Sequence, residues 1–276
     1  STVYSNLGLP SPENERALQR SVEAIEEVGA FPAVTAVLDG QLRAGVDRSE
    51  YERILGPARK AAERDLPIAV GQRWAVGATT VSASLAIAEH VGIGVFATGG
   101  IGGVHRGSEA TGDVSADLDA IGRHALATVS AGAKSFLDLP RTLEQLETLG
   151  VPVVGWETDT FPAFTARSSG LPVPHRCDDL TELVRMVEVQ RALGRGMLVV
   201  TPVPEADALD QGIHDRALEA ALSEAERNGI HGAAVTPFVL ARIAGATNGA
   251  SVPANLALVE NNARLAARLA VAMTKS

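Results

Sequence analysis

The sequence predicts an α/β protein with a three-layer α/β/α arrangement, formed by a single domain over residues 1–276 around a largely parallel or mixed sheet. Short runs rich in β-branched residues alternate along the chain with longer amphipathic segments, an order typical of strands followed by helices. Apolar residues make up 46% of the 276 residues and charged residues 21%, a composition that supports a sizeable core. No internal repeat or change in composition marks a linker, so we expect one domain.

Composition and charge restrict the function. The net charge of −9 argues against a general nucleic-acid-binding surface, although a local pocket of Lys and Arg is compatible with binding one phosphate. The single cysteine, Cys177, excludes a disulfide within the chain and argues against a structural zinc site. The sequence contains no run of eighteen apolar residues, and its first residues lack the basic and apolar regions of a secretion signal, so we expect neither a membrane span nor a signal peptide. We therefore expect a cytoplasmic protein that neither spans a membrane nor binds nucleic acid.

The first elements have clear boundary signals. Residues 1–11 are expected to form a strand and then a loop, after which Ser11 caps a helix that Gly29 ends. Residues 31–44 alternate in polarity on both sides of Asp39-Gly40, which predicts a β-hairpin with a tight primed turn. The chain therefore opens with one helix followed by a hairpin.

Three further helices are expected before residue 91. Ser49 caps a short helix that ends at Leu55, and the helix-forming residues around Lys60 predict a second short one. The third runs from Gly77 to His90. Its first turn has Thr hydroxyls and free N–H groups, which could bind an anion.

The rest of the chain alternates between buried strands and capped helices. Ser115 precedes one helix, and Asp178 or Asp179 caps another. In the last helix, Leu258, Leu265 and their neighbours form a core face. The strands expected beyond residue 91 lie at 94–97, 126–131, 151–156, 163–165 and 196–201. The helices expected there lie at 116–123, 142–149 or 140–149, 180–193, 207–228, 235–246 and 253–273, the last with Leu269 on the same face.

A glycine-rich turn follows the strand at 94–97 directly and is a candidate binding site. Glycines at 99, 100, 102 and 103 let backbone N–H groups approach a ligand closely. The dinucleotide fingerprint fails because Ile101 and His105 stand where glycine is needed, and a Walker A loop fails because Ala133 precedes Lys134. Thr98, Gly99 and Gly100 are therefore expected to cradle a phosphate or ribose in another way; the alternative is a turn needed only for packing.

Lys134 and an acidic segment near it are the candidate reactive groups. Lys134 follows a predicted strand and has only small neighbours, so its side chain either reaches solvent or enters a pocket. In a pocket its pKa would be lowered, and the neutral amine could attack a carbonyl or sugar carbon. Asp113, Ser115 and Asp117 occupy alternate positions, which face the same way in extended chain and could together bind a metal ion or a hydroxyl group. Alternatively, Ser115 only caps the next helix.

Asparagines interrupt the apolar pattern of the last helix. Asn255, Asn261 and Asn262 lie on or just before a segment that otherwise has core character. Because Asn is mildly disfavoured inside helices, we expect a polar role for this group. For Asn255 taken alone, a position in the first turn of the helix is an equally good explanation.

Several long motifs resemble one known family. They are FATGGIGGVHRG, SADL, AGAKSFLDLPRTLEQLETLGVPVVGW, FPAF with Arg167, TPFVLARIAGATNGASVPAN and LALVENNARLAA. In this order they closely resemble the pseudouridine-5′-phosphate glycosidases, also called indigoidine synthase A-like proteins. The resemblance extends over nearly the whole chain and implies an enzyme that acts on the carbon–carbon bond between ribose 5-phosphate and uracil.

The resemblance also implies roles for individual residues. It makes Lys134 the residue that forms a Schiff base with C1′ of the sugar, and it makes Asp113 a ligand of Mn²⁺. His105 lies in the glycine loop within reach of the sugar and is the second catalytic candidate. The family also forms homotrimers. The substrate-binding residues that we expect are Lys60, Val81, Thr98, Gly99, Gly100, Ser115, Ala116, Asp117 and Asn255.

Three departures from the family pattern affect the expected reaction. The proton-donating glutamate of the family stands immediately before the Ser-Thr that is Ser1-Thr2 here, so we expect it just upstream. Ser5-Asn6-Leu7-Gly8 replaces a Ser-His-Gly, and residues 71–76 replace a shorter glycine-containing link. Both replacements lie where the base is expected to bind.

These differences lead us to expect an aromatic aglycone other than uracil. The predicted activity is that of a C-glycosynthase, which joins ribose 5-phosphate to an aromatic polyketide in antibiotic biosynthesis of the alnumycin type. The alternative is the glycosidase that releases uracil from pseudouridine 5′-phosphate. A non-catalytic sugar-phosphate sensor is a third possibility, whereas the absence of an ATP loop argues against a sugar kinase.

Overall fold

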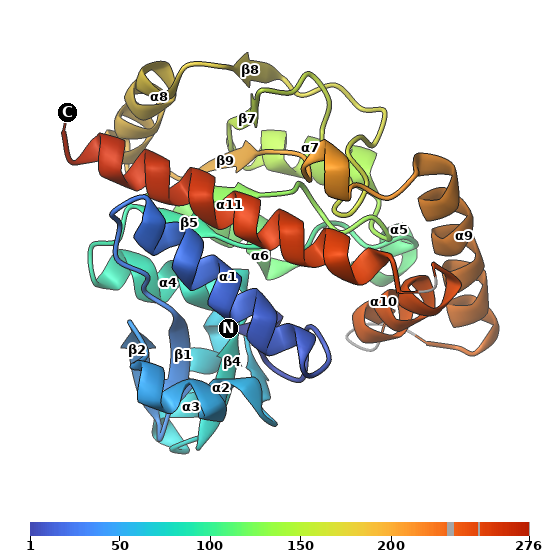
Figure 1. The fold of residues 1–276 in the computed structure, drawn as a ribbon, viewed down its shortest axis with the longest axis horizontal. Coiled ribbons are helices and arrows are strands. Elements are labelled where there is room, and N and C mark those ends of the chain that lie inside the picture. Colours follow the sequence, from blue (N-terminus) through green and yellow to red (C-terminus); the bar gives the residue numbers. More distant parts are fainter. Residues whose placement is uncertain (231–234, 248, 276) are drawn as a thin grey trace.

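The computed structural model describes residues 1–230, 235–247 and 249–275. Helices and strands alternate along the chain and pack into a three-layer α/β/α arrangement, as predicted (Figure 1). The strands are β1 (Thr35–Leu38), β2 (Gln41–Ala44), β3 (Arg59–Ala61), β4 (Val76–Thr79), β5 (Val95–Ala97), β6 (Ala127–Ser130), β7 (Val153–Trp156), β8 (His175–Cys177) and β9 (Met197–Val200). The α-helices are α1 (Glu13–Glu27), α2 (Tyr51–Leu55), α3 (Leu66–Gly71), α4 (Val81–His90), α5 (Ser108–Thr111), α6 (Ala116–Arg123), α7 (Leu139–Thr148), α8 (Leu180–Ala192), α9 (Gln211–Arg227), α10 (Val235–Ala246) and α11 (Ser251–Met273). The 3₁₀-helices are η1 (Thr2–Tyr4), η2 (Arg48–Glu50), η3 (Glu63–Asp65) and η4 (Glu205–Asp207).

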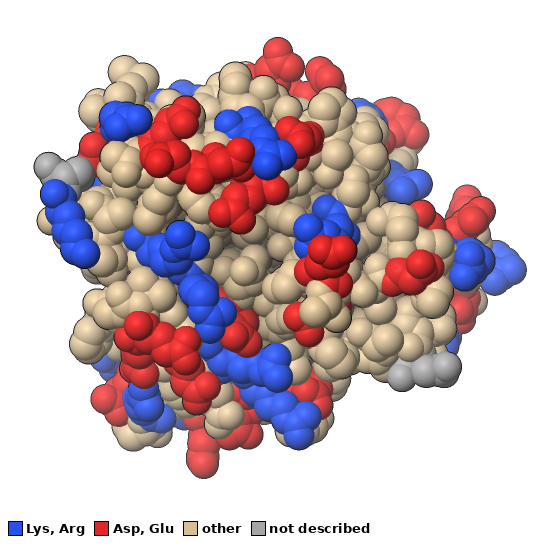
Figure 2. Space-filling view, turned by 45° about the horizontal axis from the view of Figure 1, so that its top comes forward, with Lys and Arg blue, Asp and Glu red and all other residues tan. Residues whose placement is uncertain are grey.

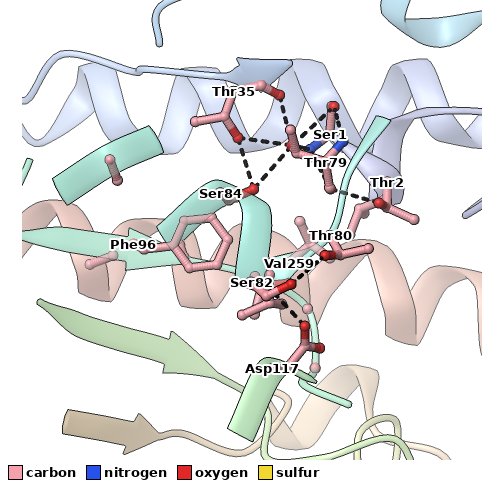
Figure 3. Close-up of a pocket in the computed structure, with 18 of the residues that line it drawn as sticks. Ser1, Thr2, Thr35, Thr79, Thr80, Ser82, Ser84, Phe96, Asp117 and Val259 are labelled. Atoms are coloured by element: carbon pink, nitrogen blue, oxygen red, sulfur yellow. Dashed lines mark hydrogen bonds between the residues drawn. The ribbon is translucent and has the colours of Figure 1, made fainter. Parts of the chain in front are cut away.

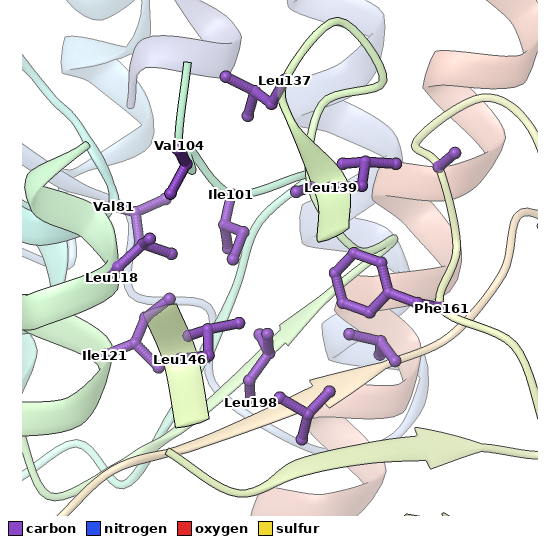
Figure 4. Packing of buried hydrophobic residues seen from close by; sticks show 14 of the residues in the cluster. Val81, Ile101, Val104, Leu118, Ile121, Leu137, Leu139, Leu146, Phe161 and Leu198 are labelled. Atoms are coloured by element: carbon purple, nitrogen blue, oxygen red, sulfur yellow. The ribbon is translucent and has the colours of Figure 1, made fainter. Parts of the chain in front are cut away.

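The larger sheet is parallel and has the order β5-β6-β9-β7-β8. Successive residues of β9 point to opposite faces. Leu198 and Val200 pack with α4, α6 and α7, whereas Met197 and Val199 pack with α8 and α11. Figure 4 shows the first of these two cores, in which Leu198 lies among leucines and isoleucines of the surrounding helices. Since parallel sheets are stabilised by burying both faces, this arrangement explains why the inner strands β7 and β9 are apolar along their whole length, whereas the edge strand β8 has exposed His175 and Arg176.

The smaller sheet is mixed and has the order β2-β1-β4-β3. β1 pairs antiparallel with β2 and β4, and β3 pairs parallel with β4. Val37 faces a core shared with α3 and α4, while Ala36 and Leu38 face α1 and α2. A single sheet had been expected from the sequence. The structure corrects this expectation, because β5 forms the edge of the larger sheet and does not pair with the smaller one.

Helix α11 connects the two parts of the molecule. It packs on β5, β6 and α8 and runs beside α1, the helix that packs on the smaller sheet (Figure 1). Leu258, Leu265 and Leu269 are buried, as their spacing predicted. The long last helix therefore covers one face of the larger sheet and also reaches the region between the sheets.

Several local predictions are correct. The hairpin β1–β2 turns at Asp39 and Gly40, both with positive φ, as a primed turn requires. Helix α6 is capped by Ser115, whose side chain accepts the Asp117 N–H, and α8 is capped by Asp179. The predicted strands at 94–97, 126–131, 151–156 and 196–201 correspond to β5, β6, β7 and β9.

Other local predictions near the amino end of the chain are wrong. Residues 1–11 contain the 3₁₀-helix η1 in place of a strand, and Pro12, not Ser11, is the N-cap of α1. Asp47, not Ser49, caps the turn that leads into α2. Lys60 lies in strand β3, although the residues around it favour helix, because pairing with β4 overrides their local propensity.

Two further boundaries need correction. The predicted helix at 77–90 begins only at Val81, because residues before it form strand β4. Residues 163–165 do not form a strand and make only isolated bridges. Phe164 has a φ of +62°, which is unusual for a bulky residue and interrupts extended structure at this point.

Acidic and basic side chains lie next to one another over much of the face shown in Figure 2. Exposed pairs such as Arg123 with Asp119 contribute little to stability, so the fold depends mainly on its buried apolar clusters. None of the described helices has both the length and the hydropathy needed to cross a bilayer.

Candidate active site

A cavity of about 970 Å³ lies between the smaller sheet, the glycine turn and α11. Its walls come from segments far apart in the sequence, and Figure 3 shows part of them. The residues proposed for the site from the sequence all line this one cavity. They are Lys60, Val81, Thr98, Gly99, Gly100, His105, Asp113, Ser115, Ala116, Asp117, Lys134 and Asn255.

Backbone hydrogen bonds bring the Lys134 loop against the glycine turn. The turn follows β5 and the loop follows β6, so the two segments leave neighbouring parallel strands at the same end. The Ala131 N–H donates to the Gly99 carbonyl at 2.9 Å, and the Lys134 N–H donates to the Ile101 carbonyl at 3.2 Å. This pairing places Lys134 beside the turn.

Two positions in these segments require glycine. A Cβ atom at Gly102 would lie 2.3 Å from Ser115 Oγ and 2.9 Å from Asp117 Oδ2. Gly132 has a φ of +69°, and a Cβ there would lie 2.0 Å from the Pro162 carbonyl oxygen. The turn and the Lys134 loop therefore approach their neighbours more closely than any side chain allows.

Asp117 joins three elements at the floor of the cavity. It is buried, and its Oδ1 accepts the Ser82 N–H of α4 at 3.1 Å. Its Oδ2 accepts the Gly102 N–H at 2.9 Å. Thus Asp117, from α6, holds one N–H of the glycine turn and one N–H of the α4 amino end, both of which had been expected to face a ligand. Only the remaining N–H groups of these segments are available to an anion.

Lys134 lies in surroundings that favour its neutral form. Its side chain is partly buried in the cavity wall, and this burial lowers the pKa of the amine. The negative charge of Asp117 opposes the shift, whereas the positive charge of Lys60 adds to it. Of the two alternatives that the sequence left open, the pocket lysine therefore describes this residue.

His105 and Asp113 lie next to each other in the cavity wall. The two segments that carry them run antiparallel, with the His105 N–H donating to the Asp113 carbonyl at 3.0 Å. His105 Nδ1 lies 3.8 Å from Asp113 Oδ2. Burial lowers the pKa of His105, Asp113 opposes this shift, and the positive charges of Lys134 and Lys60 lower the pKa further. The imidazole is therefore biased toward its neutral form.

The described residues offer only a small donor set for a metal ion. No group of three or more His, Cys, Asp and Glu side chains in the described part of the chain is arranged to hold one. Asp113 is a half-exposed carboxylate on the cavity wall. A single carboxylate with water and ligand oxygens suits a hard cation such as Mn²⁺ or Mg²⁺, but not zinc.

Two parts of the cavity wall were not predicted from the sequence. The hydroxyl groups of Thr35, Thr79 and Ser84 are buried and linked by hydrogen bonds of 2.9–3.0 Å (Figure 3). These residues come from β1, β4 and α4, and no sequence signal connects them. The Phe164 ring packs against the glycine turn, and a Cβ at Gly100 would lie 2.7 Å from it. Only its position in the FPAF motif pointed to Phe164.

Away from these polar groups, the cavity continues as an apolar space. It follows β5 and is lined by Val22 and Ile25 of α1 and by Ala266, Ala270 and Met273 of α11. The cavity therefore has a polar end around Lys134 and an apolar extension between α1 and α11.

The asparagines of α11 have separate roles. Asn255 is buried and lines the cavity, as expected. Asn262 is buried and donates to the glycine turn, and Asn261 donates to Thr201 and Pro202. Within the motif that leads to Asn255, Asn248 lies outside the described residues.

Sequence comparison relates the chain to one family. Residues 1–272 match the family described as indigoidine synthase A like protein. The chain is 46% identical over 280 residues to a pseudouridine-5′-phosphate glycosidase of Caldanaerobacter subterraneus subsp. tengcongensis, covering 100% of this chain and 90% of that protein. It is 47% identical over 274 residues to a pseudouridine-5′-phosphate glycosidase of Myxococcus xanthus, covering 98% and 90% of the two chains.

Two solved structures have the same fold. The prealnumycin C-glycosynthase AlnA, solved in complex with ribulose 5-phosphate, superimposes with a TM-score of 0.87 at 37% identity and covers 95% of this chain and 87% of AlnA. An indigoidine synthase A-like protein of Thermotoga maritima has a TM-score of 0.86 at 37% identity, with 98% of this chain and 90% of that chain covered.

Proposed function

Because the chain belongs to the indigoidine synthase A-like family, whose members compared above include glycosidases and a C-glycosynthase, we propose that it is a pseudouridine-5′-phosphate glycosidase. The proposed reaction is hydrolysis of pseudouridine 5′-phosphate to uracil and ribose 5-phosphate. The observation that carries the proposal is Lys134, an amine of lowered pKa that shares one cavity with His105, Asp113 and Asp117.

This proposal reverses the order of the two activities expected from the sequence. The curated relatives named above are glycosidases and are 46–47% identical to the chain, whereas AlnA is 37% identical. The comparisons therefore favour the glycosidase, which was the alternative, over the C-glycosynthase. The differences at residues 5–8 and 71–76 do not outweigh this similarity. The C-glycosynthase is kept as the second candidate because AlnA shares the fold over 95% of this chain.

The proposed chemistry uses Lys134 as the nucleophile. The neutral Nζ forms a bond to C1′ while the C1′–O4′ bond of the ribose breaks, and the proton lost by nitrogen is balanced by one gained at O4′. The nitrogen lone pair then forms an imine as the C1′–C5 bond breaks, and C5 takes up a proton to give uracil. Water hydrolyses the imine, which releases ribose 5-phosphate and regenerates the amine.

The other residues of the cavity support this sequence of steps. Asp117 opposes the pKa shift of Lys134 and fixes the glycine turn, and we assign to His105 the exchange of protons with the sugar hydroxyls. Lys60, Thr98, Gly99, Gly100, Val81, Ser115, Ala116 and Asn255 form the walls that would orient the sugar phosphate. We assign Asp113 as a Mn²⁺ ligand, where the cation would bind substrate oxygens and stabilise negative charge on them.

Trapping of the imine tests the nucleophile. Incubation with ribose 5-phosphate and sodium borohydride should convert the imine to a stable secondary amine at Lys134. The sequence contains only three lysines, so Lys60 and Lys275 serve as internal controls in the peptide map. A sugar-phosphate sensor would bind the ligand but remain unmodified at Lys134. Adducts on Lys60 or Lys275 alone, or full turnover by Lys134→Ala, would refute the covalent mechanism.

Product analysis separates the two candidate activities. Pseudouridine 5′-phosphate should yield uracil and ribose 5-phosphate in equal amounts, and the reverse reaction should form the C–C bond from the two products. A protein that forms the Lys134 adduct but neither cleaves pseudouridine 5′-phosphate nor makes it from uracil would support the C-glycosynthase instead.

A further inference from the structure

Asn262 is a buried polar residue that does not line the cavity. It lies on α11, and its Nδ2 donates to the carbonyl oxygen of Thr98 at 2.7 Å and to that of Gly99 at 3.1 Å. Its Oδ1 is buried and has no hydrogen-bond partner among the described residues. Thus one half of the amide is fully used by the glycine turn, and the other half is unpaired.

The helix and its apolar surroundings do not by themselves favour an asparagine at this position. An unpaired buried oxygen is unfavourable, and asparagine is a poor residue for a helix interior. The neighbours of Asn262 along the buried face, such as Leu258 and Leu265, are apolar. A leucine at this position would avoid both costs but would leave the Thr98 and Gly99 carbonyl groups without this donor, so the side chain is explained by what its donor group holds.

The two carbonyl groups that Asn262 binds belong to the turn that is hydrogen-bonded to the Lys134 loop. The Gly99 carbonyl also accepts the Ala131 N–H, and the Ile101 N–H donates to the Gly132 carbonyl at 3.0 Å. The Ile101 carbonyl in turn accepts the Lys134 N–H. The turn and the Lys134 loop are therefore joined by hydrogen bonds, and Asn262 anchors the turn to α11.

A second group holds the same turn from another direction. The ring of Phe164 packs against Gly99 and Gly100. The backbone N–H of Phe164 donates to the Ala131 carbonyl at 3.0 Å. Phe164 has a φ of +62°, a conformation that costs a bulky residue free energy and is found mostly where the surroundings impose it. The turn is thus fixed between an aromatic ring and a buried amide.

We propose that Asn262 is a positioning residue for the reaction at Lys134: its amide fixes the Thr98–Gly99 carbonyls and thereby sets the distance between the amine and the sugar carbon. This inference rests on the proposed covalent function. It assigns the buried asparagine of α11 a role in turnover and not in binding, since Asn262 lies outside the cavity wall.

The variant Asn262→Leu removes the donor and the unpaired oxygen together. A displacement of reacting groups by about 1 Å can slow a reaction on the order of 100-fold, so we expect kcat to fall between about 10-fold and 100-fold. KM should change less than about threefold, because the groups that line the cavity remain. The control is Asn261→Leu, whose side chain contacts Thr201 and Pro202 and should leave kcat unchanged.

The variant Asn262→Asp gives a signature that a loss of packing would not produce. The introduced carboxylate would face two carbonyl oxygens when it is charged, whereas the protonated carboxylic acid could donate to one of them. The ratio of its kcat to that of the wild type should therefore rise as pH falls, while the ratio for Asn262→Leu should stay flat. The charged neighbours of Asn262 on α11 are Glu260 and Arg264, which pair with each other. The Asn262→Leu variant is the control for the titration of Lys134 and His105, because both variants retain these two groups.

The outcomes separate this inference from the proposed function. If the wild type neither turns over substrate nor forms the Lys134 adduct, the proposed function fails. If the wild type is active and folded Asn262→Leu has unchanged kcat, or loses activity through KM alone, the positioning role is refuted. Should Asn262→Leu not accumulate as folded protein, the pH ratio of Asn262→Asp decides: a rise at low pH supports the role and a flat ratio overturns it.

Discussion

Replacing Asp117 by Asn would test the charge arrangement around Lys134. The two carboxylate oxygens accept the N–H groups of Ser82 at 3.1 Å and Gly102 at 2.9 Å. Asparagine retains one acceptor oxygen and turns an NH₂ group toward the second N–H donor. A hydrogen bond to a charged group contributes about 1.5–3 kcal/mol, so losing one of the two should lower the free energy of unfolding by about that amount.

The same substitution should change the pH dependence of the reaction. Burial lowers the pKa of Lys134, and the negative charge of Asp117 acts in the opposite direction. Removing this charge should lower the pKa of Lys134 further. Because the neutral amine is the reactive form, adduct formation increases as Lys134 loses its proton with rising pH. In Asp117→Asn this increase should therefore begin at a lower pH than in the wild type.

Urea unfolding followed by circular dichroism measures the first effect, and the rate of borohydride-trapped adduct as a function of pH measures the second. Asp119→Asn is the matched control because Asp119 lies on the same helix and, among the described residues, makes an exposed pair with Arg123 that is worth about 0.3–0.5 kcal/mol. The reasoning would be refuted if Asp117→Asn were as stable as the control and its pH profile were unmoved or shifted to higher pH.

Three other predictions follow from the same geometry. Lys60→Gln removes a positive charge that lowers the pKa of Lys134, so adduct formation should begin at a higher pH; an unchanged pH profile would place Lys60 too far away to act on the amine. Gly132→Ala and Gly194→Ala both introduce a side chain at positive φ, but only the Cβ at position 132 would meet a backbone carbonyl, at 2.0 Å. In urea unfolding, the free energy of unfolding should therefore be about 1–3 kcal/mol lower for Gly132→Ala than for Gly194→Ala. Removing divalent cations with a chelator should reduce turnover, and added Mn²⁺ should restore it in the wild type. The variant Asp113→Asn should need a higher Mn²⁺ concentration for the same recovery. Turnover that is insensitive to the chelator would refute the assignment of Asp113.

Local sequence signals predicted much of the fold where neighbouring residues decide the conformation. The hairpin at Asp39-Gly40 and the cap at Ser115 depend on backbone preferences within a few residues. Lys60 shows the limit of such signals, because its neighbours favour helix in isolation and only pairing with β4 makes the segment a strand. The split into two sheets was missed for the same reason, since pairing partners are chosen by contacts between distant residues.

The sequence alone identified the chemical groups of the candidate site, because Lys134, His105, Asp113 and the glycines lie in motifs long enough to indicate a family. It did not determine which of those groups face a ligand. Asp117 uses both oxygens on backbone N–H groups of the protein, and Asn262 reaches the turn from a helix more than 160 residues away in the chain. Such contacts depend on how helices pack against the sheets. The burial that lowers the pKa of Lys134 likewise arises only when these segments come together. The tertiary structure alone therefore decided both the contacts and the pKa shift.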